Sequence, residues 1–395
     1  MSQSPHPLMR DRNEERASVS YSELLFDLIY VFAVTQLSHY LLHHLDWLGY
    51  LQEFILWFAV WLAWQHTTWV TNWFNPETHS IRILLFILML IGLVMASAIP
   101  EAYTSRGLIF AACYVAIQLG RTIVVVFLLD SKHHLSQNFK RILGWFSISA
   151  VFWITGALSD GYSRIILWLV AVLCYYTSPT FGFYLPGLGR SNSSKEWTIE
   201  GQHLAERIQL FVIIAFGETI MMTGASLSEF DEWNANIIYA AVISFTNSLA
   251  MWWIYFDVSS EAGSKKMKWI SNPGLLGLKY HSIHVVLVGA LIICAVGDEL
   301  VVNHPLKEMT AAGIFAMVGG PILYLSANGV YKWITCRMIA WSHIIAIVVL
   351  ILLFPFADII NPLQLNGLTA LIFIAVVVYE TIKDKKTKIA KKEEA

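Results

Sequence analysis

Charged residues are scarce in this chain of 395 residues. Asp, Glu, Lys and Arg make up 14% of it, against about 25% in typical soluble domains, while 56% of the residues are hydrophobic. A soluble protein of this composition would have too few polar side chains to cover its surface. We therefore expect the excess of apolar side chains to face lipid, which excludes a soluble globular domain.

Cysteines and catalytic motifs are also scarce. The four cysteines form no CxxC pair and lie in or beside apolar segments, so we expect small buried packing residues. Neither a GxSxG nucleophile motif nor an HExxH zinc motif occurs. These absences argue against an enzyme. We expect no cofactor, no bound metal and no nucleic-acid partner.

Long apolar runs are abundant. A bilayer core requires about 20 apolar residues in helical form, because backbone polar groups in lipid must be satisfied within the segment. The fold class expected is all-α: a polytopic integral membrane protein of about 12 transmembrane helices, whose partner is the lipid bilayer. The predicted spans are 22–43, 50–73, 81–100, 107–129, 142–158, 163–185, 204–226, 235–256, 279–298, 309–331, 337–356 and 365–383.

The positions of Lys and Arg predict the orientation. If the N-terminus is cytoplasmic, nearly all Lys and Arg residues outside the helices fall on the cytoplasmic side, as the positive-inside rule requires. We therefore expect both termini in the cytoplasm and a location in the cell (inner or plasma) membrane. The N-terminal segment is polar up to Ser20 and no cleavage site follows, so no cleavable signal peptide is expected. The Lys and Arg residues predicted to lie on the outer side of the membrane are Arg106, Arg164 and Lys307. Those within helices or at their edges are Arg121, Arg207 and Lys279.

A central loop rich in Gly, Ser and Asn divides the predicted helices into six plus six. His79-Ser80-Ile81-Arg82 opens the third helix and His281-Ser282-Ile283-His284 opens the ninth, which suggests two parallel halves related by an internal repeat. A match of four residues also arises by chance, and both readings stay open. The predicted segments are 1–20 (cytoplasmic), 21–185 (first half), 186–203 (central loop), 204–383 (second half) and 384–395 (basic cytoplasmic tail).

Ionisable residues inside predicted helices are candidates for function, because each costs roughly 2.5 kcal/mol or more in lipid. Glu23 and Asp27 share one face of the first helix, and Arg121 lies at a similar depth in the fourth. We predict an Asp27–Arg121 ion pair, which has either a functional or a purely structural role. Arg207 and Glu218 share a face of the seventh helix.

Glu218 lies past mid-membrane beside the small Gly217, which makes it the best single candidate for coupling to a proton or cation. The alternative is a hydrogen bond that only packs helices together. His281 and His284 are spaced to share a metal or haem, but no second histidine pair lies at a matching depth on a neighbouring helix. We therefore predict no metal site there.

Several motifs resemble a known family. The run Glu23 to Ala33, with Gln36-Leu37-Ser38-His39 behind it, is similar to the opening signature of the bacterial low temperature requirement protein A family. The resemblance covers most of the chain, although after residue 230 it is only general. The further matching positions are Trp64, Asn72, 98–102, Tyr114-Val115, Arg121, Glu206-Arg207, 211–214 and 217–220.

This resemblance implies a multi-pass membrane protein linked to growth in the cold, and it leaves the mechanism open. Its motifs coincide with the polar intramembrane residues, which favours a functional role for them. The leading expectation is a transporter or channel for an unidentified solute or ion; the alternatives are an intramembrane enzyme and a sensor or assembly factor without transport. The sequence does not indicate an oligomeric state. The candidate pathway residues are Glu23, Asp27, His39, Glu101, Arg121, Arg207 and Glu218.

Overall fold

A computed structural model describes residues 7–10, 19–130, 133–260, 263, 266–267, 270, 272–357 and 359–393. The described residues form helices and turns, with two isolated bridges, Met9 to Phe74 and Leu185 to Gly189, which confirms the all-α prediction. Parts of four predicted segments lie outside the described residues: 1–6 and 11–18 of the N-terminal segment, 131–132 of the first half, 394–395 of the tail, and 261–262, 264–265, 268–269, 271 and 358 of the second half.

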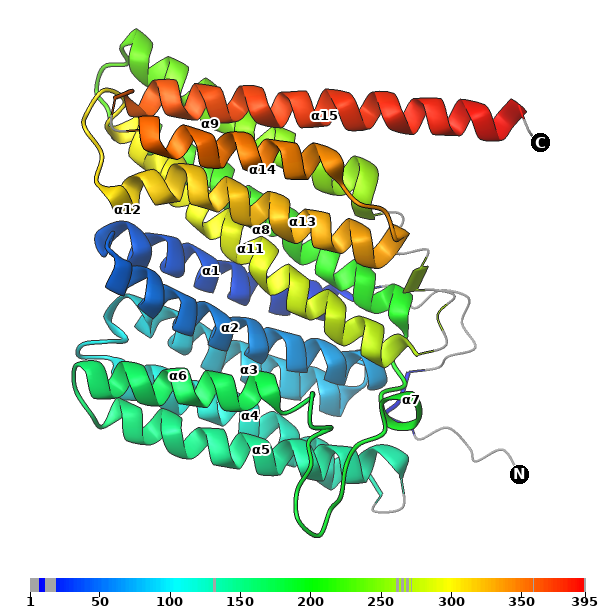
Figure 1. Ribbon diagram of the computed structural model, residues 1–395. Helices are drawn as coiled ribbons and strands as arrows, with labels where there is room; N and C mark the ends of the chain where they lie inside the picture. The colour runs from blue at the N-terminus through cyan, green and yellow to red at the C-terminus, as the bar shows by residue number, and fades with distance from the viewer. Residues whose placement is uncertain are drawn as a thin grey trace. The chain divides into compact units, whose positions relative to one another are not determined.

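Each predicted span coincides with a helical run in the part of the chain that the structure describes (Figure 1). α9 continues as a π-helix at Ile254–Ser260, and the π-helix Phe315–Gly319 joins α12 to α13. The α-helices are α1 (Tyr21–His43), α2 (Trp47–Trp73), α3 (His79–Ala98), α4 (Gly107–Leu128), α5 (His134–Ala157), α6 (Tyr162–Thr177), α7 (Ser193–Glu196), α8 (Gly201–Ser228), α9 (Ala235–Trp253), α11 (Pro273–Asn303), α12 (Ala311–Ile314), α13 (Gly320–Cys336), α14 (Trp341–Leu353) and α15 (Pro362–Glu393).

Among the described residues, eight helical runs are long and apolar enough to cross a membrane. α6 and α14 are apolar but shorter, while α2 and α5 fall outside both sets. Large apolar side chains stay exposed along the runs, including Leu90 on α3, Phe127 on α4 and Leu371 on α15. Such exposed apolar faces suit lipid and not water. The eight are α1, α3, α4, α8, α9, α11, α12–α13 and α15.

The helices form two compact units. The first comprises Met1–Tyr40, Leu48–Arg207 and Met267–Lys279, and the second comprises Leu41–Trp47, Ile208–Lys266 and Tyr280–Ala395. In the first unit, α3 packs on α4, α4 on α5 and α5 on α6 (Figure 1). In the second unit, α15 packs on α9 and α14, and α14 packs on α13.

Helix ends follow local chemistry. The Asn234 side chain accepts a hydrogen bond from the Ile237 backbone N–H and caps α9. α6 ends at Thr177, earlier than the predicted 185, because Pro179 follows two residues later and the backbone then turns through positive φ at Gly182 and Phe183. The prediction that this span runs to residue 185 was therefore wrong.

The cysteines only partly fit their prediction. All four are free thiols, and Cys294 is buried. Cys336, at the end of α13, is exposed. A cysteine beside an apolar segment is therefore not always buried, because it can lie at the exposed end of a helix.

Close packing against Gly274 yields a first prediction. A Cβ added at Gly274 would lie 2.3 Å from both the Cβ and the carbonyl oxygen of Trp197. Because backbone atoms cannot move aside cheaply, Gly274→Ala should destabilise the protein by about 1–3 kcal/mol. The measurement is the thermal melting midpoint in detergent. Gly120→Ala is the control: a Cβ there meets nothing within 4 Å, so an equal loss in both variants would contradict this account.

Candidate functional site

Buried charged side chains gather in the first unit where α1 and α8 begin. Glu23 and Asp27 lie on α1, Arg207 lies on α8, and Arg10 precedes α1. We call these four residues the ion-pair cluster. Glu23 and Asp27 are four residues apart and so share a helix face. Asp27 lies six residues after Tyr21, which begins α1, and Arg207 six residues after Gly201, which begins α8.

Arg207 binds Asp27 through two parallel hydrogen bonds. Its Nη2 donates to Asp27 Oδ1 at 2.6 Å and its Nε donates to Oδ2 at 3.1 Å. Trp64 Nε1 on α2 also donates to Oδ1, at 2.7 Å. Two-pronged pairing of this kind is strong and geometrically specific. The Asp27 carboxylate is therefore held by three donors.

Glu23 receives donors from both arginines. Arg207 Nη1 lies 2.7 Å from Glu23 Oε1, and Arg10 Nη2 lies 2.7 Å from Oε2. Ser20 donates to Oε2 from its backbone N and its hydroxyl, each at 3.0 Å, while its hydroxyl accepts from the Glu23 backbone N–H at 3.3 Å. This reciprocal pattern is a capping box, and it fixes the start of α1.

Asn72 of α2 orients His203 toward this cluster. Asn72 Nδ2 lies 3.2 Å from His203 Nδ1 and donates to the Glu200 carbonyl oxygen at 2.8 Å. His203 Nε2 then lies 3.3 Å from Glu23 Oε1 and 3.2 Å from Arg10 Nη2, so the ring contacts both members of that ion pair. Asn72 Oδ1 also accepts from the Glu200 backbone N at 2.7 Å, which fixes the start of α8.

The ion-pair cluster is closed. Two guanidinium groups balance two carboxylates, and Glu23, Asp27 and Arg207 are fully or almost fully buried. A buried pair is stable only while every partner is present, since removing one leaves an uncompensated charge. The ion-pair cluster therefore suits holding α1 to α8, as a closed latch, better than it suits binding a ligand.

The predicted Asp27–Arg121 ion pair was wrong. The ionic partner of Asp27 is Arg207, whereas Arg121 on α4 donates from Nη1 to Thr67 Oγ1 at 2.9 Å and to the Ala63 carbonyl oxygen at 3.2 Å. Its Nη2 donates to Gln118 Oε1. Similar depth does not determine which helix faces are neighbours, and here α2 supplies the residues that face Arg121.

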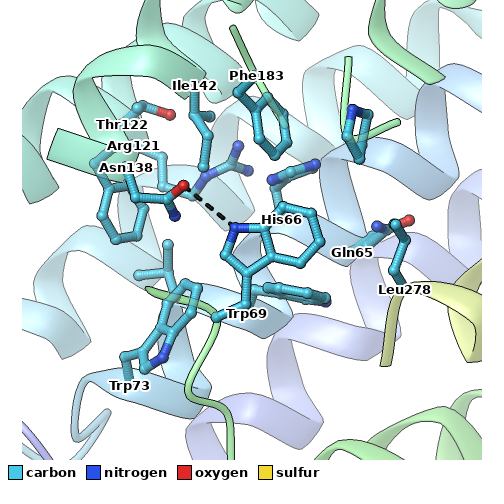
Figure 2. A pocket seen from close by; sticks show the side chains of 14 residues that line it. Gln65, His66, Trp69, Trp73, Arg121, Thr122, Asn138, Ile142, Phe183 and Leu278 are labelled. Carbon is cyan, nitrogen blue, oxygen red and sulfur yellow. Dashed lines mark hydrogen bonds between the residues drawn. The ribbon is translucent and has the colours of Figure 1, made fainter. Parts of the chain in front are cut away.

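Arg121 also lines a small cavity inside the first unit. The cavity measures about 30 Å³, counted as the space open to the centre of a water molecule. Figure 2 shows Arg121, Gln65, His66 and Asn138 among the side chains around it. The lining comes from α2, α4, α5, the residues between α6 and α8, and Leu278 of α11.

The remaining predicted residues lie apart from the ion-pair cluster. Glu218 is buried on α8 in the part that belongs to the second unit. His39 is exposed near the other end of α1. Glu101, just after α3, forms a half-exposed ion pair with Arg106 at 3.2 Å. The structure thus brings together three of the seven predicted residues: Glu23, Asp27 and Arg207.

Two examples illustrate the buried polar sites that the sequence reasoning missed. Glu53, on α2, is buried, and its Oε1 has no hydrogen-bond partner among the described residues. In the second unit, Asn366 Nδ2 donates to Ser244 Oγ at 2.9 Å and lies 3.4 Å from Asp298 Oδ1. An isolated acid in the apolar α2 run was the available signal for Glu53; no pattern links positions as distant as 244, 298 and 366.

The histidine pair forms no metal site in the part of the chain that the structure describes. His284 Nδ1 lies 2.7 Å from the Tyr280 carbonyl oxygen and Nε2 lies 2.8 Å from the Tyr255 hydroxyl. Both ring nitrogens are therefore engaged. No group of three His, Cys, Asp or Glu side chains suited to a metal occurs among the described residues.

Comparisons with known proteins agree with the sequence motifs. The family model for the bacterial low temperature requirement A protein (LtrA) matches residues 18–378, which include all of the ion-pair cluster except Arg10. The chain is 36% identical over 377 residues to Uncharacterized protein RA0937 of Rhizobium meliloti (strain 1021), covering 95% of this chain and 91% of that protein. No solved structure matches the chain. The chain therefore belongs to the bacterial low temperature requirement A family, and its apolar helices are those of a membrane protein.

Proposed function

We propose that this protein is a membrane transport protein, a transporter or channel, that moves a small solute or ion across the cell membrane. The observation that supports it is the ion-pair cluster: three of its charged residues lie on helices that can cross a membrane, α1 and α8. The proposal includes twelve spanning helices and cytoplasmic termini, in accord with the distribution of Lys and Arg.

The cost of burying these charges supports the proposal. A charged side chain within a bilayer is costly, up to about 2.5–3.5 kcal/mol at the centre, and well-packed apolar residues are often as stable as a buried ion pair, or more so. Charges retained at such a cost usually mark a pathway or a moving element. A latch between α1 and α8 can open when Arg207 exchanges its carboxylate partners for water or for a transported ion.

The proposal assigns coupling to Glu218. Its carboxyl is buried within α8, a helix long and apolar enough to cross a membrane. An acid in such a setting is costly to keep and is suited to hold a proton or a cation. In this proposal the protein is not an enzyme.

Flux measurement tests the proposal. The purified full-length protein, reconstituted in liposomes, should conduct or exchange at least one of H⁺, Na⁺, K⁺ and Cl⁻ above the level of empty liposomes. Asp27→Asn should lower that flux at least tenfold, about 1.4 kcal/mol, because the amide cannot receive both Arg207 bonds. The control is Glu77→Gln, which alters an exposed ion pair with Arg82. Folded, inserted wild-type protein that moves none of these ions would favour a sensor or assembly role instead.

A further inference from the structure

Arg121 is a buried cation without an acidic partner. Its side chain is 1% exposed, and no Asp or Glu among the described residues lies within ion-pair distance. Its protein acceptors are neutral: Thr67 Oγ1, the Ala63 carbonyl oxygen and Gln118 Oε1. The Phe146 ring, 5.6 Å from the guanidinium carbon, adds a weaker attraction. The positive charge of Arg121 is thus not neutralised by the protein.

Donor groups are left over around the Arg121 cavity. A guanidinium offers five N–H donors, and three hydrogen bonds from Arg121 are formed, none of them from Nε. Asn138 Oδ1 accepts from Ser191 Oγ at 2.7 Å and from Trp197 Nε1 at 3.4 Å, so its oxygen is occupied while its NH₂ group donates to no described residue. The buried Gln65 amide forms no hydrogen bond to any described residue. All three side chains line the cavity (Figure 2).

From this arrangement we infer that the Arg121 cavity is a binding site for a small monovalent anion of halide size. The anion would accept hydrogen bonds from the Arg121 guanidinium and from the Asn138 and Gln65 amides. It would also neutralise the buried charge, whereas water would leave that charge uncompensated.

The size and lining of the cavity define the class of anion. A buried water requires about 10–15 Å³ of such space, so the cavity has room for about two water molecules or one halide ion. Phe139, Ile142 and Leu278 make the remaining wall apolar. A weakly hydrated ion loses little on leaving water, and the low local dielectric strengthens its attraction to Arg121. Sulfate and a lipid phosphate are too large.

A binding measurement in detergent tests the inference without relying on transport. The full-length protein is melted in sodium chloride, in sodium bromide and in sodium gluconate at equal ionic strength. Chloride and bromide should raise the melting midpoint saturably, by about 2 °C or more at saturation, while gluconate should not. Bromide should also quench tryptophan fluorescence saturably, since Trp69, Trp73 and Trp197 line the cavity.

Two variants test whether the halide binds in the Arg121 cavity. Arg121→Gln should abolish the halide response, and Asn138→Ala, which retains the charge, should weaken halide binding at least fivefold even if the first variant does not fold. The control is Ser149→Ala on the same helix as Asn138; Ser149 donates to the Ala171 carbonyl oxygen and does not line the cavity. The control should respond as wild type does.

Three outcomes would overturn the inference. A response of equal size in sodium sulfate at the same ionic strength would indicate general screening. A full halide response in Asn138→Ala would place the anion elsewhere. No response of the wild type to either halide would mean that the cavity holds only water.

Discussion

Arg207→Leu is expected to destabilise the protein by about 3–5 kcal/mol, because it leaves buried carboxylates without their main partner. Glu23 would keep Arg10, at 2.7 Å, but Asp27 would keep only the Trp64 indole. The measurement is thermal or denaturant unfolding of the full-length protein in detergent. A loss of this size would lower the yield of folded protein strongly, so expression is followed by size-exclusion chromatography.

A double variant shows whether the unpaired charge is the cause. Arg207→Leu with Asp27→Asn should recover part of the lost stability, because the amide bears no charge and its oxygen still accepts from Trp64. The matched control is Arg106→Leu, which breaks the half-exposed pair with Glu101 and should cost less than about 1 kcal/mol. Equal losses in Arg207→Leu and Arg106→Leu would show that the ion-pair cluster contributes little.

The helices could be predicted from the sequence because a single apolar segment that crosses lipid has to be helical. A long apolar segment must satisfy its own N–H and C=O groups, so the apolar runs located the long helices, although not the short α7 in the predicted loop. Helix ends outside the apolar runs were less predictable: α11 begins at Pro273 and not at 279, because the Asn272 side chain accepts a hydrogen bond from the Leu275 backbone N–H and caps the helix there. The capping box Ser20-x-x-Glu23 was readable in the sequence and would have placed the start of α1 correctly.

The partner of Asp27 was not predicted, for a different reason. Arg121 was chosen because its depth is similar, but depth says nothing about which faces of the helices are neighbours. Arg207 matches the depth of Asp27 more closely than Arg121 does, since Asp27 and Arg207 each lie six residues from the start of their helix. Arg10 was beyond sequence reasoning. Its place depends on backbone bonds between the N-terminal segment and the end of α2, such as Arg10 N to the Trp73 carbonyl oxygen at 3.0 Å.

Glu218→Gln is expected to abolish activity while the protein stays folded. The residue is 2% exposed on α8, and the amide keeps its shape and most of its hydrogen-bonding capacity. An amide cannot release a proton or neutralise a cation, so coupling would be lost. Because the substitution also removes the cost of burying a charge, the melting midpoint should be unchanged or slightly raised.

Two measurements on the same variant separate coupling from packing. Growth in the cold is scored in a host that lacks its own family member and carries either the wild-type or the Glu218→Gln gene, and thermal stability is measured on both proteins in detergent. Glu232→Gln, an exposed acid between α8 and α9, is the matched control and should grow as wild type does. Failure to grow with an unchanged melting midpoint supports coupling, because a residue that only packs helices would show its effect in stability. Normal growth of the Glu218→Gln strain would refute the coupling role and leave Glu218 as a residue that holds α8 against its neighbours.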